Sequence, residues 1–328
     1  MVNWALEEKI LPLKYNWKLS RNETFEKVNF IVKVSKDNFF GMGEVAPNVR
    51  YGESLELIKS QFLILKEFLQ EVNSPAELEV LLNNQSVCNS LRFGIDSAFI
   101  HYFCGRKNLS VSSYFQLPTP NKIATCYTIP IIAPGEVKHF IETNQLDRFA
   151  TLKIKVNSEG YDLINEVQKY YKKPLKIDAN EAWREPESFL RFMEKLKNFN
   201  IDFLEQPFPS NAVEEYIYLK KNTTYPIVAD ESVTSDFSFE ELDRQFHGIN
   251  MKLMKAGSYK KGIDILKEAR AKKMITMIGC MVETSLGISS ALNIAGLSDY
   301  ADLDGFMIIK DDPFDLVKEK EGYLTLAE

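Results

Sequence analysis

The sequence predicts an α/β fold, a (β/α)₈ barrel of the TIM type with a smaller α+β domain before it. Two observations lead to this prediction. Short apolar runs recur after about Pro120, and each is followed by a charged amphipathic stretch. The polar residues that end five successive runs are 23, 27, 25 and 22 residues apart, which is room for one strand, one helix and two short loops.

The smaller domain is expected over residues 1–118. Alternating and β-branched residues predict strands over 11–20 and 25–34, and a third strand begins at Phe39. Apolar residues at helical spacing predict one helix over 55–72, and a second helix is expected over 89–104.

The barrel is expected over residues 119–305, with residues 306–328 packing back on the N-terminal domain. A repeat of this period would also suit a helical solenoid, but β-branched apolar runs between the helices favour strand–helix alternation. One strand is expected at each apolar run: 123–132, 151–156, 175–177, 203–204, 227–229, 248–253, 274–278 and 301–303.

Composition excludes several classes of protein. The chain has 328 residues, 45% of them hydrophobic, and a formal net charge of −6, as in a folded protein without affinity for nucleic acid or anionic membranes. No apolar run is long enough to span a bilayer, and the first residues lack the apolar core of a signal peptide. The four cysteines form no CxxC motif, which is typical of a cytoplasmic protein with reduced thiols. The three histidines are isolated, so a histidine-based zinc site or a Ser-His-Asp triad is disfavoured.

The candidate site consists of the charged residues at five successive strand ends. In such barrels the active site lies at the carboxyl ends of the strands. One charged strand end could equally be a surface residue, but five in succession favour a site. Strands two and six face each other across a ring of eight, with strands three to five filling the arc between them. The order along the chain is Lys155, Asp178, Glu205, Asp230 and Lys252.

The three acids predict a magnesium site. Three adjacent carboxylates repel one another, and a divalent cation removes that repulsion. Oxygen ligands without cysteine or histidine favour Mg²⁺. The alternative is a network of ion pairs between the acids and the nearby lysines.

The lysines are candidate acid/base groups. Burial and a neighbouring cation both lower the pKa of a lysine toward the range in which it can act as a base. Lys153 and Lys155 point to the same face of one strand, so Lys153 is expected to lower the pKa of Lys155. A plain surface position is the alternative for Lys153.

These motifs resemble those of the enolase superfamily, and of its muconate-lactonizing subgroup in particular. The resemblance covers nearly the whole chain, and it implies an N-terminal capping domain and one Mg²⁺ per subunit with a lysine base. Barrels of this family commonly self-associate, so a homo-oligomer is expected. The matching segments are Leu152–Lys155, Ile177–Asn180, Phe203–Pro207, Ala229–Glu231 and Asn250–Leu253.

Two further segments resemble dipeptide epimerases, of which the L-Ala-D/L-Glu epimerases are one type. One is the segment 278–283, which contains Met281 and Glu283 as candidate substrate contacts. The other contains Asp302 and Asp304, and the resemblance implies that this pair binds the α-ammonium group of a dipeptide. The alternative for Asp304 is a helix cap. The chain has Ser258 and Val282 where the family often has Gly and Ser, which leaves the reaction class unchanged and the substrate open.

The resemblance implies a two-base 1,1-proton transfer through an enediolate, which inverts the α-carbon of the C-terminal residue of a dipeptide. Lys155 and Lys252 are expected to act on opposite faces of that carbon, while Lys153 assists by electrostatics. Glu231 is expected to pair with Lys252, and Asn180 is a weaker candidate of the same kind; a plain surface acid is nearly as good an interpretation of Glu231.

Other substrate contacts are expected around the mouth of the barrel. The loop 47–53 occupies the place of the substrate-covering loop of the family, with Arg50 and Tyr51 as candidates. Arg21 and Lys310 belong to the same group, and surface placement is an equal alternative for each. The arginines favour an acidic side chain, as in Ala-Glu.

Three other functions stay open. An o-succinylbenzoate synthase or a cycloisomerase would use the same metal and at least one of the lysines. An acid-sugar dehydratase is disfavoured because the sequence has no histidine acid/base pair. A non-catalytic binding protein would be expected to lack at least one ligand or lysine, and none is lacking.

Overall fold

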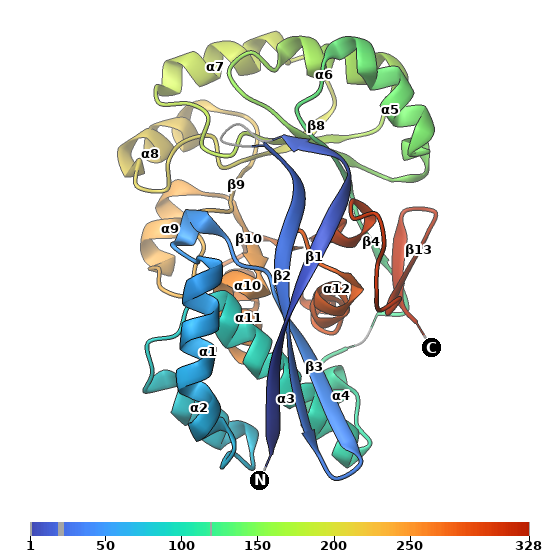
Figure 1. Ribbon diagram of the computed structural model, residues 1–328. Helices are drawn as coiled ribbons and strands as arrows, with labels where there is room; N and C mark the ends of the chain where they lie inside the picture. The colour runs from blue at the N-terminus through green and yellow to red at the C-terminus, as the bar shows by residue number, and fades with distance from the viewer. Residues whose placement is uncertain (1, 19–22, 119, 328) are drawn as a thin grey trace.

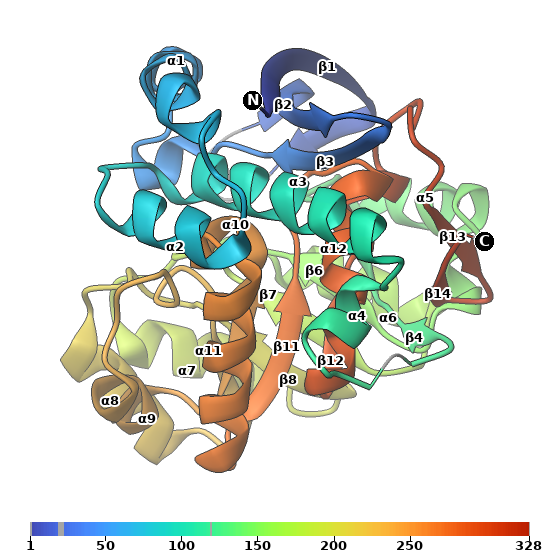
Figure 2. The same cartoon turned by 90° about the horizontal axis from the view of Figure 1, so that it is seen from below.

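The structure is a computed structural model that describes residues 2–18, 23–118 and 120–327. It confirms the predicted fold class, a parallel barrel with an antiparallel N-terminal sheet and helices placed over one end of it (Figures 1 and 2). No helix within these ranges is both long and apolar enough to cross a membrane.

The N-terminal sheet has three antiparallel strands in the order β1 (Asn3–Lys18), β2 (Glu23–Lys36) and β3 (Phe39–Val45). Strand β1 begins eight residues before the predicted start. Its early part is held by Trp4, which is buried and stacks on Phe99 of a distant helix. That contact joins residues 95 positions apart in the chain, so alternation within the strand could not indicate it.

Four helices follow, and the apolar faces of the first three form a core with one face of the sheet. Ser54 and Ser74 cap the first two helices by accepting hydrogen bonds from backbone N–H groups. The third helix contacts β3 closely, because a Cβ atom at Gly43 would lie 2.1 Å from the carbonyl oxygen of Gly94. The helices are α1 (Leu55–Leu69), α2 (Pro75–Asn83), α3 (Asn89–Lys107) and α4 (Val111–Tyr114).

The barrel strands are parallel and pair in sequence order, and a bridge between Thr125 and Ala301 links the two ends of the sheet. One strand of the barrel lies at each apolar run that the sequence analysis identified. The strands are β5 (Tyr127–Ile129), β6 (Leu152–Lys155), β7 (Leu175–Asp178), β8 (Ile201–Glu205), β9 (Ile227–Ala229), β10 (Gly248–Lys252), β11 (Ile275–Gly279) and β12 (Tyr300–Asp302).

The helices between these strands cover the outside of the barrel. Helix α3 lies between the N-terminal sheet and the barrel helices in Figure 2, and it contacts α10 and α11. The helices are α5 (Val137–Thr143), α6 (Tyr161–Tyr170), α7 (Pro186–Lys195), α8 (Val213–Asn222), α9 (Phe239–Gln245), α10 (Leu253–Ala256), α11 (Tyr259–Ala271) and α12 (Ser285–Leu292).

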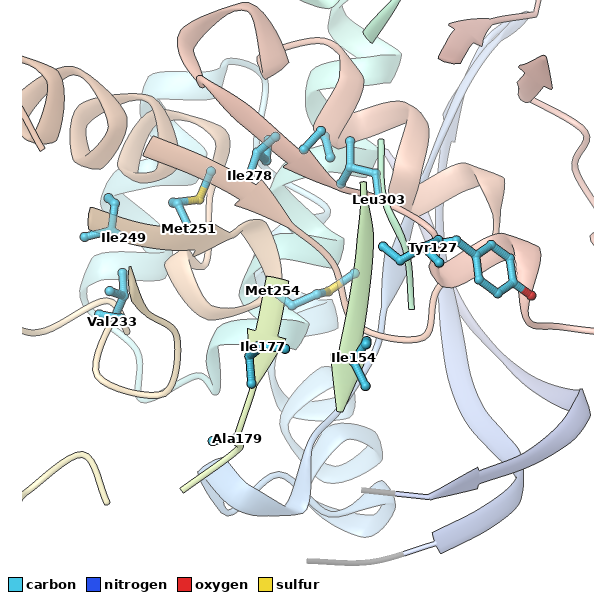
Figure 3. Packing of buried hydrophobic residues seen from close by; sticks show 14 of the residues in the cluster. Tyr127, Ile154, Ile177, Ala179, Val233, Ile249, Met251, Met254, Ile278 and Leu303 are labelled. Atoms are coloured by element: carbon cyan, nitrogen blue, oxygen red, sulfur yellow. The ribbon is translucent and has the colours of Figure 1, made fainter. Parts of the chain in front are cut away.

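Side chains alternate between the two faces of each barrel strand. Ile154 and Ile177, on neighbouring strands, belong to the large apolar cluster shown in Figure 3. The residues on either side of Ile154 are Lys153 and Lys155, which therefore point to the opposite face, into the barrel. On β6 the alternation thus places Ile154 toward the helices and the two lysines toward the interior of the barrel.

The chain differs from the prediction at the first barrel run. Residues 123–132 were expected to form one strand, but Ile123–Ala124 form β4, and the barrel strand begins only at Tyr127. Strand β4 pairs with a C-terminal hairpin, β13 (Val317–Lys320) and β14 (Tyr323–Leu326). A run of apolar residues does not show that its two halves pair with different partners.

The N-terminal sheet and the C-terminal segment both contact the barrel. Leu11, Leu13 and Trp17 of β1 belong to the same apolar cluster as the barrel residues. Two backbone hydrogen bonds join β1 to the C-terminal segment, from Lys14 to Ile308 and from Lys310 to Pro12. The domain divisions at 118/119 and 305/306 stay predictions.

Candidate active site

A cavity of about 420 Å³ lies at the carboxyl ends of the barrel strands. The loop after β3, which contains the short 3₁₀ turn Val49–Tyr51, and residues of β1 and β2 form its other side. Most of the side chains that the sequence predicted for the site line this cavity: Arg50, Tyr51, Lys153, Lys155, Asn180, Asp230, Glu231, Lys252, Met281, Asp302 and Asp304.

Strand register brings Lys155, Asp178 and Glu205 to one level of the barrel. Lys155 pairs with Asp178 across β6 and β7, and Asp178 pairs with Glu205 across β7 and β8. The ammonium group of Lys155 donates to Asp178 Oδ2 at 2.8 Å and to Asn180 Oδ1 at 3.0 Å. The first lysine is thus oriented by a carboxylate on the neighbouring strand.

Lys252 occupies the end of β10, four strands away from β6 in the ring of eight. Its ammonium group donates to Asp230 Oδ2 at 2.8 Å. Lys255, which the sequence analysis missed, donates to the other oxygen of Asp230 at 2.7 Å. It lies on α10, and strand alternation could not predict a contact made from a short helix.

Lys153 lies between three carboxylates, in contact with Asp178 at 2.9 Å, Glu205 at 3.0 Å and Asp302 at 2.8 Å. Burial acts to lower its pKa, but these carboxylates outweigh burial and raise the pKa well above the usual lysine value. For Lys252, burial again acts to lower the pKa and the charge of Asp230 acts to raise it, and the pKa is raised overall. The sequence analysis expected lysine pKa values to be lowered, and for Lys153 and Lys252 that expectation is wrong because the neighbouring carboxylates outweigh burial.

The carboxylates fit a magnesium ion. Among the described residues, no three Asp, Glu, His or Cys side chains are grouped as a ready metal site, because ammonium groups lie between the acids. Burial raises the pKa of Glu205 to about 7, with the charges of Asp178 and Asp230 adding to the effect. The Oε2 atom of Glu205 is buried and accepts no hydrogen bond. The oxygen donors of Asp178, Glu205 and Asp230 suit Mg²⁺, and Glu205 Oε2 has a lone pair that no hydrogen bond uses.

Asp302 and Asp304 lie together at the end of β12, where both line the cavity. Asp302 accepts from Lys153 at 2.8 Å and from the Cys126 thiol at 3.2 Å. Asp304 accepts from the backbone N–H of Thr128 at 2.6 Å. Burial and the charge of Asp302 raise the pKa of Asp304 to about 6. The pair therefore presents negative charge to the cavity.

The substrate contacts predicted from loops fall into three groups. Arg50 and Tyr51 line the cavity, but the Arg50 guanidinium forms a two-point ion pair with Glu181 at 3.0 and 2.8 Å. Lys310 is exposed and does not line the cavity. Arg21 lies outside the described residues.

Asn180 and Glu231 contact each other at the mouth, with Asn180 Nδ2 donating to Glu231 Oε1 at 3.3 Å. Glu231 was expected to pair with Lys252, but Lys252 donates to Asp230. Asn180 and Glu181 both have positive φ values, 41° and 63°. Left-handed backbone at non-glycine residues costs free energy and is found at functional sites, and here it turns the Asn180 side chain toward Lys155.

Of the two candidate substrate contacts in the segment after β11, one lines the cavity and the other does not. Met281 lines it, whereas the Glu283 carboxylate accepts a hydrogen bond from the Met281 N–H at 2.7 Å. A Cβ atom at Gly287 would lie 2.2 Å from Glu283 Oε2 and 3.0 Å from Glu44 Oε2. Glu283 thus lies beside a second buried carboxylate, where β3 meets α12, and not among the cavity residues.

Burial, with the charge of Glu44, raises the pKa of Glu283 to about 8. An unfolded glutamate has a pKa of about 4.3, so the folded protein binds one more proton between these values. Stability is therefore expected to fall as the pH rises from about 4.3 to about 8, by ~1.4 kcal/mol per pH unit at most. Glu283→Gln removes this dependence of stability on pH. At pH 9, where the wild type has a buried charge at this position, the variant is expected to be the more stable protein.

Thermal unfolding between pH 5 and pH 9 measures this effect. Glu240→Gln, at an exposed position on α9, is the matched control and should unfold in parallel with the wild type. Parallel curves for wild type and Glu283→Gln would show that Glu283 is ionised in the folded protein.

Two other polar residues of the site were missed. Asn250, two positions before Lys252 and on the same face of β10, donates to Glu205 Oε1 at 2.9 Å. Its alternation with Lys252 was the signal that could have identified it. Lys27 of β2 lines the cavity from the opposite side, and nothing in the local sequence indicates that β2 lies over the barrel mouth.

Comparisons with known proteins agree with this arrangement. Residues 136–317 match the family described as Enolase C-terminal domain-like. Over 331 residues the chain is 26% identical to a Flavobacterium johnsoniae protein named L-Ala-D/L-amino acid epimerase, an alignment that covers 98% of this chain and 96% of that protein.

Two solved structures are similar over almost the whole chain. The substrate-liganded L-Ala-D/L-Glu epimerase from Bacillus subtilis is 26% identical, with a TM-score of 0.92 over 99% of this chain and 96% of that one. The dipeptide epimerase from Enterococcus faecalis, complexed with Mg and L-Leu-L-Tyr, is 23% identical, with a TM-score of 0.88 over 99% and 97%. The family match spans more than half of the sequence, and the chain therefore belongs to the enolase superfamily, in which it is an isomerase.

Proposed function

We propose that this enzyme is a magnesium-dependent dipeptide epimerase, which inverts the α-carbon of the C-terminal residue. The observation that carries the proposal is the placement of Lys155 and Lys252 on opposite sides of one barrel, where both line the cavity and each is ion-paired with a buried carboxylate. The epimerase names of the Flavobacterium and Bacillus relatives and the dipeptide in the Enterococcus structure support the choice of reaction.

Inversion needs two acid/base groups on opposite faces of the reacting carbon. One lysine acts as the neutral amine and accepts the α-proton on its Nζ atom, and the other acts as the ammonium group and donates a proton from its own Nζ on the opposite face. A single lysine would return the proton to the face from which it came. Asp178 and Asp230 orient the two ammonium groups through 2.8 Å contacts, and both lysines are about nine-tenths buried. The cavity therefore holds both groups in fixed positions before the substrate arrives.

The remaining charged residues hold the ends of the substrate. When bound, Mg²⁺ at Asp178, Glu205 and Asp230 would stabilise the negative charge that develops on the substrate carboxylate. Lys153, which contacts Asp178 and Glu205, adds positive charge at the same level. Asp302 and Asp304 bind the α-ammonium group, and this contact fixes the distance between the ammonium group and the reacting carbon.

Solvent exchange tests the reaction without knowledge of the natural substrate. The protein is incubated with Mg²⁺ and a pooled dipeptide library in D₂O, and mass spectrometry measures which peptides gain one mass unit. We expect a subset to gain deuterium, the gain to disappear with EDTA and to return with added Mg²⁺. Exchange in none of the dipeptides would reject the proposal, and o-succinylbenzoate synthesis and cycloisomerisation would be tested next.

A further inference from the structure

A second cavity, of about 600 Å³, lies between the N-terminal helices and the barrel. Helices α2, α3 and α4 form one side of it, and α10, α11 and the loop after β9 form the other (Figure 2). None of its described lining residues also lines the catalytic cavity. The proposed mechanism therefore uses no part of this second cavity.

Arg92 and Asp96 bring opposite charges to the side of the cavity that α3 forms. They lie four positions apart, so their side chains share one face of the helix, with about 5–6 Å between the Cβ atoms. The charge of each acts on the pKa of the other, yet no ion pair joins these two described side chains. The guanidinium and the carboxylate therefore lie near each other with a gap between them.

Both side chains keep hydrogen-bonding capacity that the protein does not use. Arg92 donates to the carbonyl oxygen of Leu82 at 2.8 Å and to Asn83 Oδ1, which are neutral acceptors, and a guanidinium has five N–H donors. Asp96 Oδ2 accepts from the Tyr259 N–H at 2.9 Å, and no described residue donates to Oδ1. Burial lowers the pKa of Arg92 and raises that of Asp96 to about 7, so both charges are partly removed from water. Because buried charges are normally paired, a ligand with one anionic and one cationic group would complement this pair.

Apolar side chains line the same cavity beside the two charges. Ile100 lies one helical turn beyond Asp96 on α3, and the rings of Tyr114 and Phe115 meet edge to face with their centroids 4.8 Å apart. Both rings are half-buried. The other charged side chains that line the cavity, on α2 and α11, are exposed or ion-paired. The cavity therefore offers a cation, an anion and an apolar surface to one small ligand.

We propose that this cavity is a second binding site, which takes a free α-amino acid with an apolar side chain. The α-carboxylate binds Arg92, the α-ammonium group binds Asp96, and the side chain packs on the apolar residues. Both charges of an α-amino acid are attached to one carbon atom, which suits two protein side chains one helical turn apart. The charged ends of a dipeptide belong to two different residues and lie too far apart for this gap. The inference does not depend on the proposed epimerase reaction.

Three matched ligands separate the two charges. L-Leucine has both, isopentylamine lacks the carboxylate, and 4-methylpentanoate lacks the ammonium group. Isothermal titration calorimetry at pH 8, where Asp96 is mainly ionised, measures the affinity of the protein for each ligand. We expect L-leucine to bind the wild type saturably. Arg92→Met and Asp96→Asn are each expected to weaken that binding about 10- to 100-fold, the range for a hydrogen bond to a charged group.

The two analogues show whether each variant loses a specific contact or its fold. Arg92→Met should weaken the binding of 4-methylpentanoate and leave that of isopentylamine unchanged, and Asp96→Asn should do the reverse. A variant with Asn at both Asp302 and Asp304, and Lys107→Met at the exposed end of α3, should bind L-leucine as the wild type does. Three results would overturn the proposal: no saturable binding of L-leucine to the wild type, equal loss of both analogues in a folded variant, or loss of binding when the catalytic cavity is altered.

Discussion

Replacement of Lys155 or Lys252 with methionine is expected to reduce epimerisation by about 10²- to 10⁴-fold, the usual contribution of a positioned acid or base. Each variant lacks one of the two groups that must act on opposite faces of the α-carbon, so inversion fails in both. Methionine keeps most of the length of the side chain, which limits the change in packing around the strand ends.

The two lysine variants should differ in proton exchange. The variant without the base for the L-isomer should lose deuterium exchange from L-substrate and keep exchange from D-substrate, while the other variant shows the reverse. NMR of each pure isomer in D₂O measures this, and thermal unfolding shows whether the variant is folded. The control is Lys260→Met, on α11, where Lys260 forms an exposed ion pair with Glu79 of α2. Full epimerase activity in both lysine variants would exclude the two-base mechanism.

Replacement of Asp302 and Asp304 together with asparagine is expected to lower kcat/KM for dipeptides about 30- to 5,000-fold. Loss of one side of a buried charge pair costs roughly 2–5 kcal/mol, and this variant removes the negative charge that the α-ammonium group needs. Asparagine keeps the shape of each side chain and can still accept the hydrogen bond from the Thr128 N–H. The loss of kcat/KM therefore measures the effect of the negative charge and not of a change in the local fold.

N-acetylated dipeptides distinguish this role from a structural one. The wild type should discriminate strongly between a dipeptide and its N-acetyl form, and the double variant should lose most of that discrimination. Asp311→Asn, an exposed position in the same segment, should behave as the wild type. If the double variant kept the full preference for the free ammonium group, Asp302 and Asp304 would not be its binding site.

Regular spacing is the reason why so much of the barrel could be predicted. Parallel strands of a barrel end at one face, so a charged residue at a strand end is placed in space by its position in the chain. Asp178 and Glu205, for example, lie 27 residues apart in the sequence and are direct partners across β7 and β8. Alternation also indicated correctly that Lys153 and Lys155 share one face.

The same reasoning fails where an element lacks a repeating partner. Residues 123–132 read as one strand, yet β4 pairs with a hairpin some 200 residues later in the chain, and only β5 belongs to the barrel. Glu283 read as a substrate contact because of its motif, yet its carboxylate lies between Met281 and Glu44. Neither outcome depends on the residues next to these positions.

The sequence by itself determined the fold class, the order of the barrel strands and the identity of the charged residues at the strand ends. Only the tertiary structure decided which charges are paired. Lys153 contacts Asp302 across 149 residues of sequence, and Arg50 contacts Glu181 across 131. Strand periodicity is local and repeats along the chain, whereas an ion pair depends on the distance between two side chains from separate elements, which packing fixes. For that reason Lys27 could be recognised as a cavity residue only from the position of β2 over the barrel mouth. Its charge has no partner among the described residues.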